Sequence, residues 1–130
     1  MIGLDTSVVV RLIIGQPADQ CAAARRRLEL ALTAAEPVIV SDLVIGESYY
    51  ALQHHYGVPR DEARALLRRF LESGAVTPEP SGIAAVLQWV ERGAGLLDRL
   101  IHLRYHECGA ATVTFDVQQS RLRDAVRLRP

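Results

Sequence analysis

Apolar and polar positions along the chain follow two patterns, one typical of short buried strands and one typical of helices. Short apolar runs predict strands at residues 1–5, 38–40, 75–80, 111–115 and 125–128, the last of them at an edge. Helical spacing predicts helices from Thr6 or Ser7 onward and over about residues 18–35, 41–55, 60–73, 81–92 and 96–108, with a short one after Asp116. Because such strands alternate with helices, we expect the α/β class, with a parallel sheet covered on both faces.

Residues with known preferences for helix ends support these boundaries. The hydroxyl groups of Thr6 or Ser7, of Ser41 and of Ser81 are suited to cap the helices that follow them. Gly109 is suited to end the helix over 96–108, since glycine adopts the left-handed backbone conformation that often terminates a helix.

Four acidic residues stand at notable places in this pattern. Asp5 and Asp116 each end a predicted strand, and ligands of parallel α/β sheets bind beyond the carboxyl ends of the strands. Glu47 lies in the helix after the second strand, where its helical neighbours are apolar, so we expect a carboxylate that is costly to bury alone. Asp98 lies near the start of the helix over 96–108.

Each of these acids also has a purely local interpretation. Asp5 and Asp116 are suited to cap turns or helices, Asp98 to complement a helix dipole, and Glu47 to pair with a buried arginine. Taken together, however, their order along the chain would bring all four to one end of the sheet. Clusters of carboxylate oxygens are the ligands that Mg²⁺ and Mn²⁺ prefer, so we expect a site for one of these ions.

Length and composition restrict the number of domains, the location of the protein and the chemistry that its side chains can carry out. The 130 residues suit one domain, no apolar run is long enough to cross a bilayer, and the N-terminal segment has no basic region, so we expect a cytoplasmic protein. All fifteen basic residues are arginine, which excludes a P-loop lysine or a Schiff base. The net charge of zero does not indicate a polyanion partner. Cys21 and Cys108 are expected to be reduced thiols.

Two further groups of residues remain ambiguous. Arg60, Arg64 and Arg68 share one helix face and suit either contact with a phosphate backbone or a protein partner, or a solvated face partly neutralised by nearby acids. His102 shares a face with Asp98 and His106, and it suits either a packed histidine or an accessory role at a metal carboxylate.

Four segments of the chain resemble the PIN-domain nucleases, and most closely the VapC-type toxins of toxin–antitoxin pairs. They are LDTSVVV at 4–10, VSDLVIGESYYAL at 40–52, LLDRLIHL at 96–103 and GAATVTFD at 109–116. The resemblance implies a single PIN-like domain over 1–130, in three α/β/α layers with a central parallel sheet of about four to five strands. It also implies a Mg²⁺- or Mn²⁺-dependent endoribonuclease that cleaves RNA by metal-activated water, is neutralised by a VapB-like antitoxin and forms a homodimer.

When the site residues of the family are carried over by position, the resemblance implies that the catalytic and metal-binding residues are Asp5, Glu47, Asp98 and Asp116. Thr6, beside the first acid, and Thr114, before the last, match accessory polar positions.

The chain departs from the family pattern at three places. Gly95 stands where many relatives carry another acid, bulky His102 stands where alanine is common, and Val117-Gln118-Gln119 replaces a charged residue, Asp and an aromatic. A catalytically weak PIN domain that binds RNA or an antitoxin is therefore the alternative. A dehalogenase-like phosphatase is disfavoured, because it requires a second Asp after the first and a downstream Lys.

Overall fold

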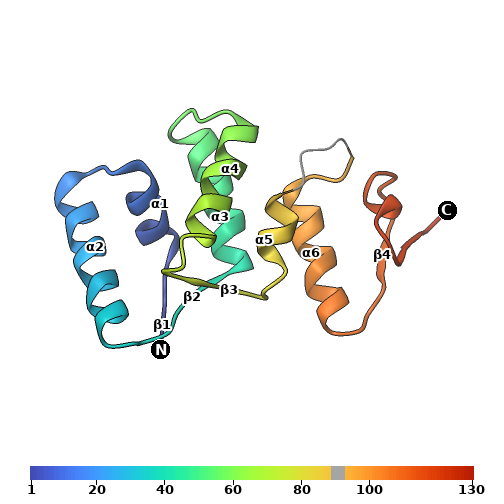
Figure 1. Ribbon diagram of the computed structural model, residues 1–130. Coiled ribbons are helices and arrows are strands. Elements are labelled where there is room, and N and C mark those ends of the chain that lie inside the picture. Colours follow the sequence, from blue (N-terminus) through green and yellow to red (C-terminus); the bar gives the residue numbers. More distant parts are fainter. Residues whose placement is uncertain (89–92) are drawn as a thin grey trace. The chain divides into compact units, whose positions relative to one another are not determined.

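The computed structural model describes residues 1–88 and 93–130, which belong to two compact units. The N-terminal unit comprises Met1–Gln88 and the C-terminal unit Trp89–Pro130. Each unit has its own helices and its own parallel strands (Figure 1), and each is described by itself below.

The N-terminal unit contains a three-stranded parallel sheet in the order β1-β2-β3. Its strands are β1 (Ile2–Gly3), β2 (Val38–Ser41) and β3 (Thr77–Glu79). In the β1–β2 pair Gly3 lies opposite Ile39, and the amide of Leu4 extends the pairing by donating to the carbonyl of Ile39 at 3.0 Å. Because the strands are parallel, the segments that follow β1 and β2 leave the sheet at the same edge.

Five helices accompany this sheet: α1 (Thr6–Ile14), α2 (Ala18–Thr33), α3 (Asp42–His54), α4 (Arg60–Leu71) and α5 (Ile83–Leu87). Helix α1 packs against α2 and α3, and α4 packs against α3 and α5 (Figure 1). The side chains that are fully buried between these elements form the core: Val9, Val40, Ile45, Leu52, Leu67 and Ile83.

The C-terminal unit is built from α6 (Leu96–Glu107), β4 (Thr112–Thr114), the 3-10 helix η1 (Gln119–Arg121) and β5 (Ala125–Arg127). Strands β4 and β5 pair in parallel. Leu96 and Leu100 are buried on one face of α6. Gly109, whose φ is +74°, follows the end of α6, as the sequence predicts.

The predicted α/β class with parallel strands is confirmed. All five predicted strands occur, three of them in the parallel sheet of the N-terminal unit and two in that of the C-terminal unit. That residues 1–130 form a single domain stays a prediction. No helix in the described ranges is long and apolar enough to cross a bilayer.

Two predicted helix caps are wrong. Asp5, not Thr6 or Ser7, caps α1, because Thr6 is already the first helical residue and Asp5 has the extended backbone that a cap requires. Ser81 does not cap α5, whose first amide, that of Ile83, donates instead to the carbonyl of Pro80 at 3.3 Å. The predicted continuation of this helix to Arg92 falls on residues 89–92, outside the described residues. Ser41 does cap α3, with its Oγ accepting from the amide of Val44 at 3.2 Å.

The two ends of α3 provide a matched test of this packing. Leu52 is 0% exposed and Leu43 is 78% exposed, although both are leucines of the same helix. We expect Leu52→Ala to lower the free energy of unfolding by about 2–5 kcal/mol through loss of buried apolar contacts. Leu43→Ala should change it by about 0.5 kcal/mol or less. Urea unfolding of both variants measures the difference, and equal losses would contradict the described packing of α3.

Candidate functional site

The N-terminal unit brings Asp5 and the Glu47 carboxylate into one hydrogen-bonded arrangement, here called the N-terminal pair. Asp5 directly follows the β1 segment and caps α1, and Glu47 lies in the second turn of α3. Between them, the Thr6 hydroxyl donates to Glu47 Oε1 at 3.0 Å. The parallel pairing of β1 with β2 produces this arrangement, since it starts α1 and α3 from the same edge of the sheet.

Asp5 is held as a carboxylate by its neighbours along the chain. Its Oδ2 accepts hydrogen bonds from Ser7 Oγ at 2.9 Å and from the Ser7 amide at 3.4 Å. The Ser7 hydroxyl and then the amides of Ser7 and Thr6 lower the pKa of Asp5 below its ordinary value, and partial desolvation opposes them weakly. Asp5 is therefore ionised at neutral pH.

The expectation that Glu47 lies on a buried apolar face is wrong. Glu47 is exposed, and two of its helical neighbours, Leu43 and Tyr50, are also exposed, at 78% and 56%. The face of α3 that packs into the core carries Ile45, Ser48 and Leu52. The alternative of a buried pair with an arginine is not seen either, because no salt bridge to Glu47 occurs among the residues described.

The C-terminal unit contains a second arrangement, here called the C-terminal pair, which joins the segments of Asp98 and Asp116. Asp98 lies in the first turn of α6, and Asp116 follows β4. Gln119 donates to both segments, from its amide to Asp116 Oδ1 at 2.7 Å and from its side-chain Nε2 to the Asp98 carbonyl at 3.2 Å. Thr114 Oγ1 accepts from the Asp116 amide at 3.0 Å, which fixes the backbone at the acid.

The local interpretations of three acids are therefore seen in the structure. Asp5 caps α1, Asp98 lies at the positive end of the α6 dipole, and Asp116 accepts from the amide three residues on. These local bonds do not conflict with metal binding, since each carboxylate has two oxygens and several lone pairs.

Ser7 and Gln119 were not among the predicted site residues. A signal for each was present in the sequence, because a residue that follows an aspartate by two or three positions often donates its amide to that carboxylate. The spacing did not reveal that the Gln119 side chain reaches back to α6, a contact over 21 residues.

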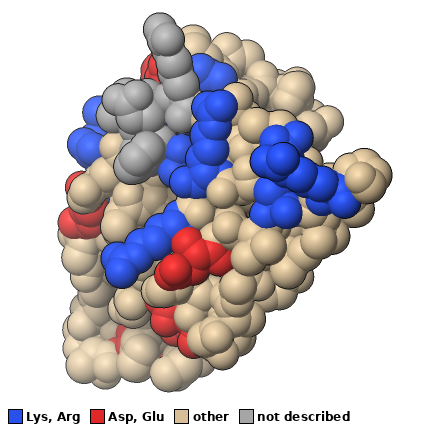
Figure 2. Space-filling model, turned by 90° about the vertical axis from the view of Figure 1, so that its right-hand side faces the viewer, with Lys and Arg blue, Asp and Glu red and all other residues tan. Residues whose placement is uncertain are grey.

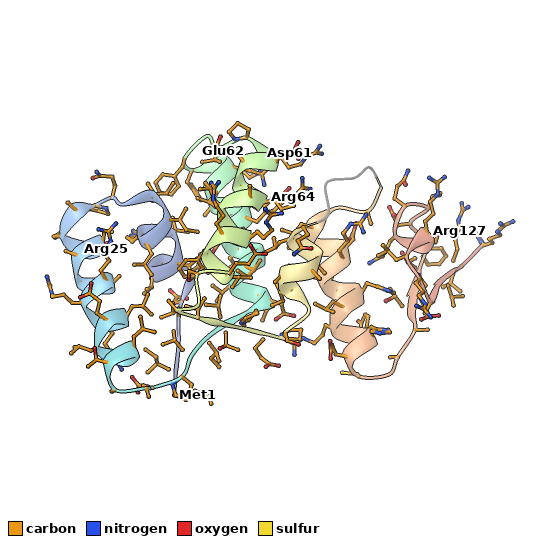
Figure 3. All side chains as sticks on the ribbon, in the orientation of Figure 1. Met1, Arg25, Asp61, Glu62, Arg64 and Arg127 are labelled. Atoms are coloured by element: carbon orange, nitrogen blue, oxygen red, sulfur yellow. The ribbon has the colours of Figure 1, made fainter. Side chains whose placement is uncertain are left out.

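Two predicted accessory groups have other partners. His102 Nδ1 lies 2.8 Å from the hydroxyl of buried Thr112, and its ring stacks on that of His106 at 6.4 Å, so the structure favours a packed histidine. The arginine stripe of α4 is neutralised in part, since Arg60 and Arg64 lie 3.6 Å and 3.2 Å from Asp61. Figure 3 shows Asp61 and Arg64 near the same end of α4. The partial neutralisation agrees with the second interpretation of the stripe, but Arg64 is only 14% exposed, so not all of the stripe is solvated.

Arginine is nevertheless widespread on the surface. Figure 2 shows arginine side chains spread over one face, with acidic side chains among some of them. The described part of the C-terminal unit carries more arginines than acids, and its arginines are Arg99, Arg104, Arg121, Arg123, Arg127 and Arg129. Their guanidinium groups can bind phosphate oxygens in a bidentate manner.

The side-chain oxygens of both pairs are suitable ligands for a hard divalent cation. All four side chains supply carboxylate oxygens, and within residues 1–88 and 93–130 none of them forms a salt bridge with an arginine or histidine. Among those same residues, no three Asp, Glu, His or Cys side chains gather into one group that could hold a metal ion. Each unit by itself thus contributes two of the four predicted acids.

Comparison with known proteins gives one match. The sequence profile of the PIN domain matches residues 2–125, which is nearly the whole chain. No curated protein matches the chain, and no solved structure does.

Replacing Ser7 tests the electrostatics of the N-terminal pair. Ser7→Ala removes the hydroxyl that lowers the pKa of Asp5 most, so we expect this pKa to rise toward its ordinary value. A lowered pKa in the folded state stabilises the fold above the ordinary pKa, and this contribution is lost as the pH falls through the lowered value. In Ser7→Ala this contribution should be smaller, and its loss should be complete at a higher pH. Carboxyl ¹³C shifts of Asp5, followed by NMR during a pH titration, measure the change.

Ser41→Ala is the matched control, since it also removes a serine hydroxyl at a helix start. It should lower the free energy of unfolding by about 1 kcal/mol through loss of the α3 cap. The pKa of Asp5 should stay as in the unchanged protein. An equal pKa in Ser7→Ala and the unchanged protein would refute the assigned cause.

Proposed function

The chain belongs to the PIN domain family, and from this premise we propose that it is a Mg²⁺- or Mn²⁺-dependent endoribonuclease of the VapC toxin type. PIN domains are generally metal-dependent nucleases, so the family supports a phosphodiester hydrolase. The observation that carries the proposal is the presence in each unit of two of the four predicted acids without an arginine partner among the described residues; Asp5, Glu47 and Asp116 accept hydrogen bonds from neutral donors instead.

In this proposal Asp5, Glu47, Asp98 and Asp116 hold the metal. Their carboxylate oxygens suit Mg²⁺ or Mn²⁺, and Asp5 is ionised at neutral pH and needs to lose no proton on binding. Thr6 and Ser7 orient the N-terminal pair, and Thr114 orients the backbone of Asp116. When bound, the ion would activate water and stabilise charge on the attacking and leaving oxygens of the RNA phosphodiester.

The chain's own residues would bind and orient the reactants. Lysine is absent from the sequence, and no cysteine–histidine or serine-elbow pattern occurs in it, so we propose no covalent intermediate. Arginines of the C-terminal unit are the candidates for contact with the RNA backbone, because guanidinium groups bind phosphate well.

The toxin assignment extends the proposal to partners. The four segments at 4–10, 40–52, 96–103 and 109–116 resemble VapC-type toxins, which supports a cognate VapB-like antitoxin as inhibitor and a homodimer as the assembled form. We propose that antitoxin binding suppresses cleavage of RNA. Purified chain alone should then cleave RNA without any further protein.

Replacement of single carboxylates tests the proposed chemistry. We expect Asp5→Asn and Asp116→Asn each to lower the rate of RNA cleavage by at least about 100-fold, because each removes a charge that binds the metal. Asn caps helices about as well as Asp, so Asp5→Asn should still fold. Cleavage of total RNA with Mg²⁺, with Mn²⁺ and with excess EDTA measures the effect.

Asp124→Asn is the matched control. Asp124 lies in the same unit as Asp116 and has a φ of +65°, a conformation that Asn tolerates. It should cleave like the unchanged chain. Full activity in EDTA, or in Asp5→Asn and Asp116→Asn, would sink the metal mechanism. No cleavage by the unchanged chain, with RNA binding retained, would favour the alternative of a catalytically weak binding module.

A further inference from the structure

We propose that Gln119 is a positioning residue, which holds the segments of Asp98 and Asp116 in the arrangement that binds the metal. This inference deepens the proposed function and rests on it. Gln119 touches neither substrate nor metal in this proposal; it acts through the two acids.

Gln119 bonds to both acid-bearing segments of the C-terminal unit, to one through its backbone amide and to the other through its side chain. It is 8% exposed at the start of η1. Its amide donates to Asp116 Oδ1 at 2.7 Å, and its Nε2 donates to the Asp98 carbonyl at 3.2 Å. Gln119 thus bonds directly to the carboxylate of Asp116. It holds the helix turn that carries Asp98 through the backbone carbonyl of Asp98.

The bond to Asp116 leaves the carboxylate suited to ligate a cation. Gln119 occupies Oδ1, while Oδ2 has no hydrogen-bond partner in the described parts of the chain. The donor is the backbone amide of Gln119, which carries no net charge, so it orients the carboxylate without offsetting its negative charge. A guanidinium donor to the same carboxylate would offset that charge and weaken the attraction for a divalent ion.

A purely local role does not account for the side chain. The backbone amide alone suffices to close the turn after Asp116, and it does so without the side chain. The Nε2 bond instead crosses to another element, 21 residues away in sequence. Its neighbour Gln118 shows a contrast, since it is exposed and the hydrogen bond from Arg121 to its Oε1, at 3.3 Å, stays within the same turn.

Leucine and glutamate replacements of Gln119 test the inference with Mn²⁺ alone as the probe. Gln119→Leu keeps the size and removes the donor, and Gln119→Glu keeps the size and replaces the donor by an acceptor facing the Asp98 carbonyl. We expect each to weaken Mn²⁺ binding about 10-fold, as outer-shell changes at metal sites commonly do. Isothermal titration calorimetry measures the affinity, and Gln118→Leu, the matched control, should bind like the unchanged chain.

Hydrogen exchange of the metal-free protein provides a readout that is independent of the ion. In both Gln119 variants, amides in the first turns of α6, residues 96–102, should exchange faster, while Gln118→Leu leaves them unchanged. Thermal unfolding checks that the compared variants are folded. If one of the two Gln119 replacements does not fold, the other replacement tests the inference.

The outcomes separate the two proposals. Weaker Mn²⁺ binding together with faster exchange supports the positioning role. Unchanged affinity in a folded Gln119 variant overturns it, even if exchange is faster, because the residue would then be structural only. If the unchanged chain itself binds no Mn²⁺, the metal-dependent function fails, and the positioning role fails with it.

Discussion

Three of the four proposed site acids, Asp5, Glu47 and Asp116, are held by neutral hydrogen-bond donors rather than by cations among the described residues. A carboxylate that is paired with a guanidinium group is already offset in charge and attracts a metal ion less strongly, whereas one that is held by hydroxyl or amide groups keeps its charge. Ser7 holds Asp5, Thr6 holds Glu47, and Gln119 holds Asp116. The arginines that pair in the N-terminal unit do so with other acids, such as Asp61 and Glu36. The fold thereby orients these carboxylates without pairing them with a guanidinium group.

The parallel pairing of strands explains why such donors are available. In the N-terminal unit the pairing of β1 with β2 places the starts of α1 and α3 at one edge, which lets Thr6 reach Glu47 from a neighbouring helix. In the C-terminal unit the β4–β5 pairing closes a loop that contains η1, and Gln119 of η1 bonds back to α6. In both units the donor residue is close in sequence to one acid and bonds to a distant segment. Thr6 is next to Asp5 and bonds to Glu47, and Gln119 is near Asp116 and bonds to Asp98.

Much of this architecture follows from local patterns in the sequence. The strands, α1 to α4, α6 and the cap of α3 by Ser41 were predictable, because apolar periodicity and capping preferences act over a few residues. The exposure of Glu47 was not predictable, since which face of α3 packs depends on helices distant in sequence. The same holds for the division of the strands into two sheets and for the reach of Gln119 to Asp98, both of which are tertiary contacts.

The departures from the family pattern change the charge of the proposed site more than its framework. Gly95, where many relatives carry another acid, caps α6 without a side chain, and a Cβ built there would meet no atom within 4 Å. Packing therefore does not exclude a larger residue at this position. The missing acid removes one negative charge and one source of repulsion from the start of α6, so that Asp98 is the acid of its first turn. Two neutral groups of Gln119, its backbone amide and its Nε2, bond to Asp116 and to the Asp98 turn, so the contact between these segments uses no positive charge.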